Sequence, residues 1–197
     1  MARRRAAPSE GVGRLVQRDR SPVPDVPGEI RAVIVLRDEM LRLPRILDWH
    51  RALGVGRFLV VDNDSRDGTA DFLLTQPDVH VFHTDGSFAA SQCGTAWTNA
   101  LLDAYCPAHW TLVVDADELF VYPDCERIGI GRLVRHLDAT GAEAMFAVLV
   151  DMYAAGPIAE ARLAPGATLL SACPHFDPGP YRAIASRVFP HRELIGG

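Results

Sequence analysis

The feature that most constrains this chain is the alternation, from Ile30 onward, of short hydrophobic runs with longer segments of helical spacing. Runs rich in β-branched residues have the length of single strands, and the segments between them place apolar residues three or four positions apart. The expected strands are 30–36, 58–61, 79–82, 110–114 and 144–150, and the expected helices are 43–53, 69–75, 89–105 and 130–137. Such alternation predicts an α/β fold, a mostly parallel sheet with helices on both faces.

Composition narrows the classes of partner. The chain has 197 residues and a net charge of −5, so no overall basic field favours nucleic acid or an anionic membrane. Its longest apolar runs, such as 144–150, are far shorter than a membrane span. The four cysteines form no Cys-x-x-Cys pair, which favours reduced thiols in a cytoplasmic protein. We therefore expect a cytoplasmic protein with no transmembrane segment and no nucleic-acid partner.

The N-terminal residues have a different character. Residues 1–28 carry three arginines at positions 3–5, end in a proline-rich stretch and show no apolar period. This composition predicts a disordered leader. The folded domain is then expected over 29–197.

Acidic residues follow three of the expected strands. They stand at 38–39, at 62–64 and at 115–118. In a parallel sheet, ligands bind outside the carboxyl ends of the strands, so these clusters are predicted to meet at one rim. Asp115 and Asp117 are two residues apart, and on extended backbone they would point the same way and suit Mn²⁺ or Mg²⁺. The alternative for them is a polar turn with a solvated acidic cluster.

The other polar candidates also have simpler interpretations. Asp62 ends a strand and is predicted to bind ligand, whereas Asp64, Ser65, Asp67 and Gly68 fit a capped strand-to-helix loop. The loop at 37–39 lacks the glycine-rich turn of a dinucleotide site; its residues either line a nucleotide pocket or form surface ion pairs. Asn99 is either a ligand contact or plain helix surface.

Six motifs stand in a specific order between about residues 30 and 153. They are Arg37-Asp-Glu, Arg51-Ala-Leu-Gly-Val, the segment 58–69, Asn99, Val113-Val-Asp-Ala-Asp-Glu-Leu-Phe and Asp151-Met-Tyr. Taken together, these motifs resemble family 2-like glycosyltransferases of the GT-A fold. The resemblance is closest to a bacterial branch with the Arg-Ala-Leu-Gly-Val and Asp-Met-Tyr motifs.

The resemblance implies a metal-dependent glycosyltransferase that moves a sugar from a nucleotide-diphosphate donor to an acceptor hydroxyl, with inversion. It implies that Asp115 and Asp117 hold Mn²⁺ or Mg²⁺, Asp117 more directly. It also implies a nucleotide-sugar pocket formed by Arg37, Glu39, Asp62, Asn63, Asn99 and Asp115. The acceptor is an unspecified glycan, lipid or small molecule. Asn63 departs from the pattern, because many members carry a second Asp there.

The catalytic base of such enzymes usually lies well after the Asp-x-Asp motif. The sequence ends at Gly197, which predicts a C-terminally truncated domain with Asp151 as the nearby candidate for the base. Two other interpretations stay open. One is a truncated, non-catalytic domain that binds nucleotide or a partner protein. The other is a haloacid-dehalogenase-like phosphotransferase with Asp115 as nucleophile, although its motif normally follows the first strand.

Overall fold

The computed structural model describes residues 11–179, 182–185 and 193–196, and it divides into two compact units, Met1–Thr140 and Gly141–Gly197. The sequence predicts one domain over 29–197. The structure instead separates the residues after Thr140 from the unit that holds the sheet.

The first unit contains a five-stranded sheet in the order β1-β4-β3-β2-β5. Four strands run parallel: β2 (Arg31–Leu36), β3 (Arg57–Asp62), β4 (Val79–His83) and β5 (Thr111–Val113). The short β1 (Val16–Gln17) pairs antiparallel with β4 at the edge. The predicted α/β class with a mostly parallel sheet is thereby confirmed.

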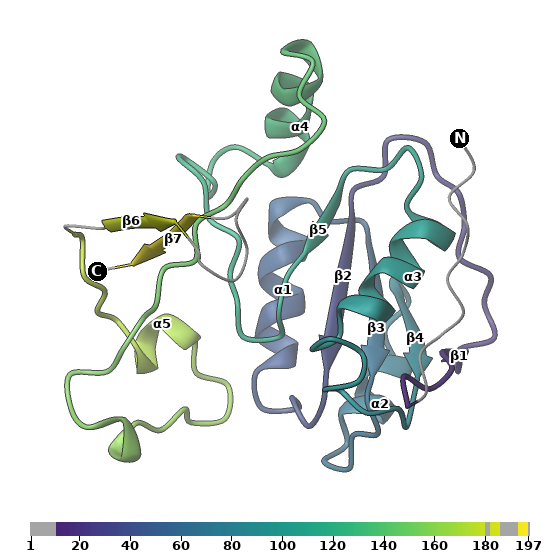
Figure 1. Cartoon of the computed structure of the whole chain (residues 1–197), viewed down its shortest axis with the longest axis horizontal. Coiled ribbons are helices and arrows are strands. Elements are labelled where there is room, and N and C mark those ends of the chain that lie inside the picture. Colours follow the sequence, from purple (N-terminus) through teal and green to yellow (C-terminus); the bar gives the residue numbers. More distant parts are fainter. Residues whose placement is uncertain (1–10, 180–181, 186–192, 197) are drawn as a thin grey trace. The chain divides into compact units, whose positions relative to one another are not determined.

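The order of the strands determines where a crevice opens. From β2 the chain adds β3 and β4 on one side and then crosses to place β5 on the other side of β2. Loops that leave β2 and β5 at their carboxyl ends therefore turn in opposite directions, as at the switch point of a doubly wound sheet. In Figure 1 these ends point toward the lower edge of the sheet.

Helices cover both faces of this sheet. They are α1 (Leu43–Leu53), α2 (Thr69–Leu74) and α3 (Thr95–Tyr105). A fourth helix, α4 (Ile130–Ala139), buries only Ile130 and projects away from the sheet in Figure 1. Val33 and Leu59 share a buried cluster with Trp97 of α3. Side chains alternate along a strand, so Phe58 faces the other way, where Arg51 of α1 lies over its ring at 5.7 Å. Figure 1 shows α1 and α3 on opposite sides of β2.

The prediction of a disordered leader over residues 1–28 is wrong for residues 11–28, which pack on the sheet; residues 1–10 lie outside the described residues. The indole Nε1–H of Trp97 donates to the carbonyl oxygen of Val12 over 2.8 Å, and both residues are buried. Short polar and apolar contacts of this kind give no periodic signal, which is why composition alone misleads here.

Two further contacts fix this N-terminal segment. Asp19 accepts a hydrogen bond from the backbone N–H of Val81 at 2.9 Å and lies 2.8 Å from Nδ1 of His80. Gly86 closes against the segment, because a Cβ at that position would lie 2.0 Å from the carbonyl oxygen of Val12. Residues 11–28 thus belong to the first unit.

Two predicted elements differ from those observed. The helix expected over 89–105 begins at Thr95, because Gln92 and Cys93 have φ values of 57° and 55°, which a continuing right-handed helix does not allow. Residues 144–150, expected as a strand, form none, and Phe146 is 80% exposed. A β-branched run becomes a strand only where a neighbouring strand accepts it; in the described part of the chain these residues pair with none.

The second unit holds short elements. These are a 3₁₀ turn η1 (Ile158–Glu160), α5 (Leu169–Ala172) and the antiparallel pair β6 (Arg182–Ala185) and β7 (Glu193–Gly196). Tyr153 and His175 form an isolated antiparallel bridge. Across both units, no described helix combines the length and apolar character needed to cross a membrane.

Candidate functional site

A pocket of about 770 Å³ lies at the carboxyl ends of β2 and β5, within the first unit. Its size falls in the range of small-molecule sites. Apolar side chains form much of its wall, and polar groups come from the loops after β2, β3 and β5 and from the segment that enters α3. The lining residues that carry polar chemistry are Arg37, Glu39, Asn63, Cys93, Thr95, Thr98, Asn99, Asp115 and Asp117.

Most of the residues predicted from the sequence meet here. Six of them line this one pocket although they are far apart in the chain: Arg37, Glu39, Asn63, Asn99, Asp115 and Asp117. Asp62 and Asp151 are not among the lining residues. Asp151 belongs to the second unit, where its side chain is exposed.

Asp62 lies at the end of β3 beside the pocket residue Asn63, but its side chain is only 3% exposed. Its carboxylate accepts a hydrogen bond from the backbone N–H of Ser65 at 3.3 Å and lies 3.3 Å from Nδ1 of His83. Asn63 donates both amide hydrogens to the carbonyl oxygens of Thr84 and Gly86, at 3.1 and 2.9 Å. Its carbonyl oxygen is therefore the atom left for a ligand.

The loop after β3 holds the loop after β2 in place. Hydrogen bonds between the two loops use backbone N–H groups as donors in every case, and the acceptors are side-chain oxygens. They run from Asp38 to Ser65 Oγ (2.9 Å), from Glu39 to Thr69 Oγ1 (3.0 Å), from Met40 to Asp67 Oδ2 (2.9 Å) and from Arg66 to Asp38 Oδ1 (2.6 Å). The structural interpretation of Ser65 and Asp67 is confirmed, and their contacts fix Glu39 at the rim.

Asp115 and Asp117 reach the pocket through a turn rather than extended backbone. The strand β5 ends at Val113, and residues 116–117 form a turn. Glu118 closes it twice: its N–H donates to the carbonyl oxygen of Asp115 at 3.2 Å, and its carboxylate accepts from the N–H of Asp115 at 3.0 Å. The predicted extended geometry is wrong because these hydrogen bonds bend the chain directly after the strand. Both carboxylates still line the pocket.

Negative charge is concentrated at this turn. Burial raises the pKa of Asp115, and the nearby carboxylates of Glu118 and Asp117 raise it further. One cation lies close by: Arg42 donates to both carboxylate oxygens of Glu39, at 2.5 and 2.6 Å, and its Nη1 lies 3.7 Å from Asp117 Oδ2. Arg37 pairs with Asp38 at 3.7 Å and also lines the pocket, so both alternatives for this loop hold in part.

The donor set suits a divalent cation that completes its coordination with other oxygens. In the part of the chain that the structure describes, no group of three or more His, Cys, Asp or Glu side chains is arranged to hold a metal ion. Asp115 and Asp117 offer carboxylates at a common pocket. Mg²⁺ typically uses one or two carboxylates together with waters and substrate phosphates.

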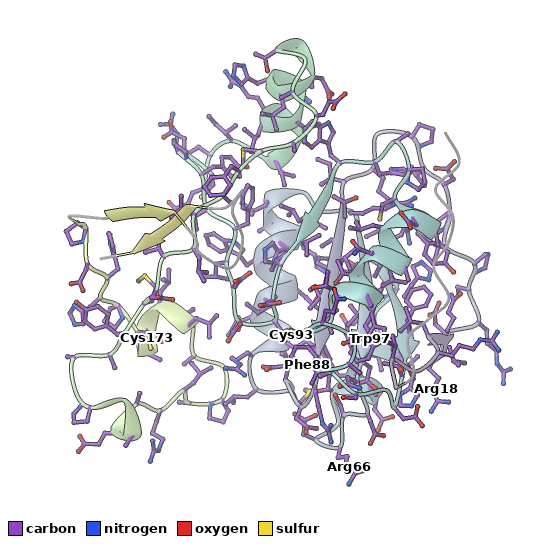
Figure 2. All side chains as sticks on the ribbon, in the orientation of Figure 1. Arg18, Arg66, Phe88, Cys93, Trp97 and Cys173 are labelled. Carbon is purple, nitrogen blue, oxygen red and sulfur yellow. The ribbon has the colours of Figure 1, made fainter. Side chains whose placement is uncertain are left out.

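One wall of the pocket was not anticipated from the sequence. Phe88 and Cys93 line it, and Figure 2 shows both close to Trp97, whose ring centroid lies 6.4 Å from that of Phe88. The fully buried Ser91 shapes this wall: its hydroxyl donates to the carbonyl oxygen of Phe88 at 2.6 Å and accepts from the N–H of Gly94 at 2.9 Å. The signal for this wall in the sequence is Gly94, which comes just before a helix that begins Thr95-Ala-Trp-Thr.

No family model matches this chain, and no curated protein matches it. The family-level resemblance read from the motifs is therefore an expectation, and the function rests on the pocket and its residues.

Proposed function

We propose that this chain is a metal-dependent glycosyltransferase of the family 2-like type, with a GT-A-like fold, acting on a nucleotide-diphosphate sugar. One observation carries the proposal. Groups from four separate segments converge on one pocket at the switch point of the sheet: Glu39 after β2, Asn63 after β3, Asn99 in α3, and Asp115 with Asp117 after β5.

The chemistry of these groups supports a diphosphate ligand. Three carboxylates and one arginine line the pocket, so a diphosphate would need further positive charge there, which a divalent cation supplies. Asp115 and Asp117 would hold Mn²⁺ or Mg²⁺. When bound, the ion supplies positive charge that stabilises the nucleoside-diphosphate leaving group. The apolar wall with Phe88 and Leu102 suits the flat faces of a base or sugar.

The residues of the chain then orient the donor. The carbonyl oxygen of Asn63 is free to accept an N–H of the nucleoside, and Asn99 and Arg37 present polar groups on the pocket wall. Asp62 is buried, contacts Ser65 and His83, and does not line the pocket, so the donor contact at the end of β3 is assigned to Asn63. Inverting transfer also needs a base that takes the proton from the acceptor hydroxyl as it attacks the anomeric carbon. The assignment of that base to Asp151 stays a prediction.

The proposal is tested by metal-dependent donor hydrolysis. Purified full-length protein is incubated with a panel of nucleotide sugars and Mn²⁺, and release of the nucleoside diphosphate is measured. The Mn²⁺-dependent rate of Asp117→Ala is expected to be at least tenfold lower than that of wild type. Asp103→Ala is the matched control, because this carboxylate is exposed on α3 and does not line the pocket. Equal Mn²⁺-dependent rates in wild type and Asp117→Ala would overturn the metal role.

The same preparation separates the other interpretations. Binding of a nucleoside diphosphate without any turnover on the panel would favour a non-catalytic binding domain. Formation of a fluoroberyllate adduct at Asp115 would favour a phosphotransferase, in which this residue acts as nucleophile.

A further inference from the structure

Arg42 links the two sides of the crevice. Its guanidinium joins Glu39, which follows β2, to Asp117, which follows β5. Nε and Nη2 are both committed to Glu39, at 2.6 and 2.5 Å, so only Nη1 faces Asp117. Arg42 does not itself appear among the residues that line the pocket.

The two contacts of Arg42 differ in kind. The bidentate pair with Glu39 is a charge-assisted hydrogen-bonded fork, and the Glu39 side chain is only 16% exposed. The 3.7 Å separation from Asp117 exceeds hydrogen-bond length and leaves a charge contact between two groups that are partly open to water. Arg42 is therefore anchored on Glu39, whereas its contact with Asp117 is easily exchanged.

The anchor itself is fixed. The N–H of Glu39 donates to Thr69 Oγ1 at 3.0 Å, and its carbonyl oxygen accepts from the N–H groups of Arg42 and Leu43 at the start of α1. Asp117, by contrast, stands in a turn with its side chain 55% exposed. When the partner of Asp117 changes, the carboxylate can move while the arginine stays.

We propose that Arg42 is a positioning residue that competes with the divalent cation for Asp117. It holds this carboxylate when no metal is bound and yields it when the metal binds, so that the pocket binds metal alone less tightly than its carboxylates would allow. This inference rests on the proposed metal role of Asp117. A positive charge 3.7 Å from the ligand oxygen opposes a second cation both by occupying the carboxylate and by direct repulsion.

The test measures Mn²⁺ binding to the full chain in the absence of nucleotide. The electron paramagnetic resonance signal of free Mn²⁺ reports how much of the ion stays unbound. Arg42→Met is expected to bind Mn²⁺ about fivefold more tightly than wild type, the effect of a partly exposed ion pair. Arg42→Lys keeps the charge but cannot form the two-nitrogen fork with Glu39, so its Mn²⁺ affinity is expected to lie between those of wild type and Arg42→Met. Circular dichroism checks the fold, and Arg42→Gln replaces the Met variant should that one unfold.

Arg66→Met is the matched control. It removes the same charge from an exposed arginine that pairs with Asp64 at 3.1 Å and does not line the pocket. It is expected to change Mn²⁺ affinity by less than twofold. An equal gain in Arg66→Met and Arg42→Met would reduce the effect to the net charge of the protein and overturn the inference.

The remaining outcomes separate this inference from the function beneath it. If wild type binds Mn²⁺, Asp117→Asn does not, and Arg42→Met matches wild type or binds more weakly, only the competition is wrong. If wild type and Asp117→Asn bind Mn²⁺ equally, or neither binds it, the metal role of Asp117 fails and the competition fails with it.

Discussion

At the scale of single residues, the turn after β5 gathers more negative charge than its surroundings offset. Asp115, Asp117 and Glu118 lie within four positions, and Glu118 is occupied in closing the turn. Only Arg42 approaches the carboxylate of Asp117 among the described ion pairs. Such an arrangement stores unfavourable charge repulsion in the folded chain, as binding sites for cations commonly do.

Burial of Asp115 and its repulsion by these neighbours predict a gain in stability for Asp115→Asn. The pKa of Asp115 is raised in the folded protein by burial and by Glu118 and Asp117, so the folded state holds this proton more tightly than the unfolded state. The contribution to stability is fully present below the unfolded pKa of about 3.9 and is lost as pH rises through the folded pKa. Without metal, Asp115→Asn is expected to have a higher Tm than wild type at pH 7, with the difference shrinking toward pH 3. A lower Tm at pH 7 would contradict this.

Residue chemistry also explains what the sequence predicted about the site and what it missed. Asp115, Asp117, Glu39 and Asn99 were found because each lies just beyond a strand end or on the following helix, where parallel sheets bring ligands. Asp62 was predicted for the same reason, but it is buried and Asn63 takes the place at the pocket. Neighbouring side chains at a strand end point in different directions, so a pocket meets one of them and not the other. The hydrophobic pattern of the strand does not say which one.

At the scale of elements, α1 is tied to the strand beside it by an ion pair that a pH titration can detect. Arg51 donates to both carboxylate oxygens of Asp78, each at 2.7 Å, just before β4. Burial alone would raise the pKa of Asp78, but the hydrogen bonds and charge of Arg51 outweigh it, so the pKa is lowered. Both side chains are less than a third exposed.

We expect Arg51→Met to lower the free energy of unfolding by about 1–2 kcal/mol at pH 7. The stabilising effect of a lowered carboxyl pKa is present above the unfolded value of about 3.9 and is lost as pH falls through the folded pKa. The difference between Arg51→Met and wild type is therefore expected to narrow below pH 4. Urea unfolding at pH 7, 4 and 3 measures it, and a difference that stays constant across this range would show that the ion pair is not its source.

The N-terminal segment is the element that sequence patterns missed. It docks through a few specific contacts, among them the Trp97 indole with the carbonyl oxygen of Val12 and Asp19 with the edge of β4. The four parallel strands and the helices at 43–53, 69–75 and 130–137 were predicted to within a few residues, because burial on one face repeats along the element. The segment 11–28 carries no such repeat.

Replacing Trp97 with Phe tests this docking. The substitution keeps an aromatic ring in the core but leaves the buried carbonyl group of Val12 without its donor, at a cost of about 1–3 kcal/mol. Amide hydrogen exchange in residues 11–19 is expected to rise more than in β2 and β3. Uniform change across the sheet would instead indicate a general packing defect.

At the scale of the whole molecule, every residue that lines the pocket belongs to the first unit. The sequence predicted one domain because its motifs run on past residue 140 in an order that resembles a single family. Whether a hydrophobic run such as 144–150 joins a sheet depends on strands that are distant in the chain. The local sequence pattern does not show whether such a strand is present.

The position of the pocket leads to a prediction for a shortened chain. A protein that ends at Thr140 retains the sheet, α1 to α4 and all lining residues, so it is expected to bind Mn²⁺ within about threefold of the full chain. The same Mn²⁺ titration measures this. A folded 1–140 chain with no Mn²⁺ affinity would show that residues after Thr140 supply part of the site.

The most direct test of the central claim is calorimetric titration of the full chain with UDP, GDP, ADP, CDP and dTDP, each with Mn²⁺ and with EDTA. If Asp117 holds a cation that grips a diphosphate, at least one nucleotide binds with Mn²⁺, and that binding is lost with EDTA and in Asp117→Asn but kept in Asp103→Asn. The account would be contradicted if nucleotide affinity were the same with Mn²⁺ and with EDTA and the same in wild type and Asp117→Asn. It would also be contradicted if none of the five nucleotides bound.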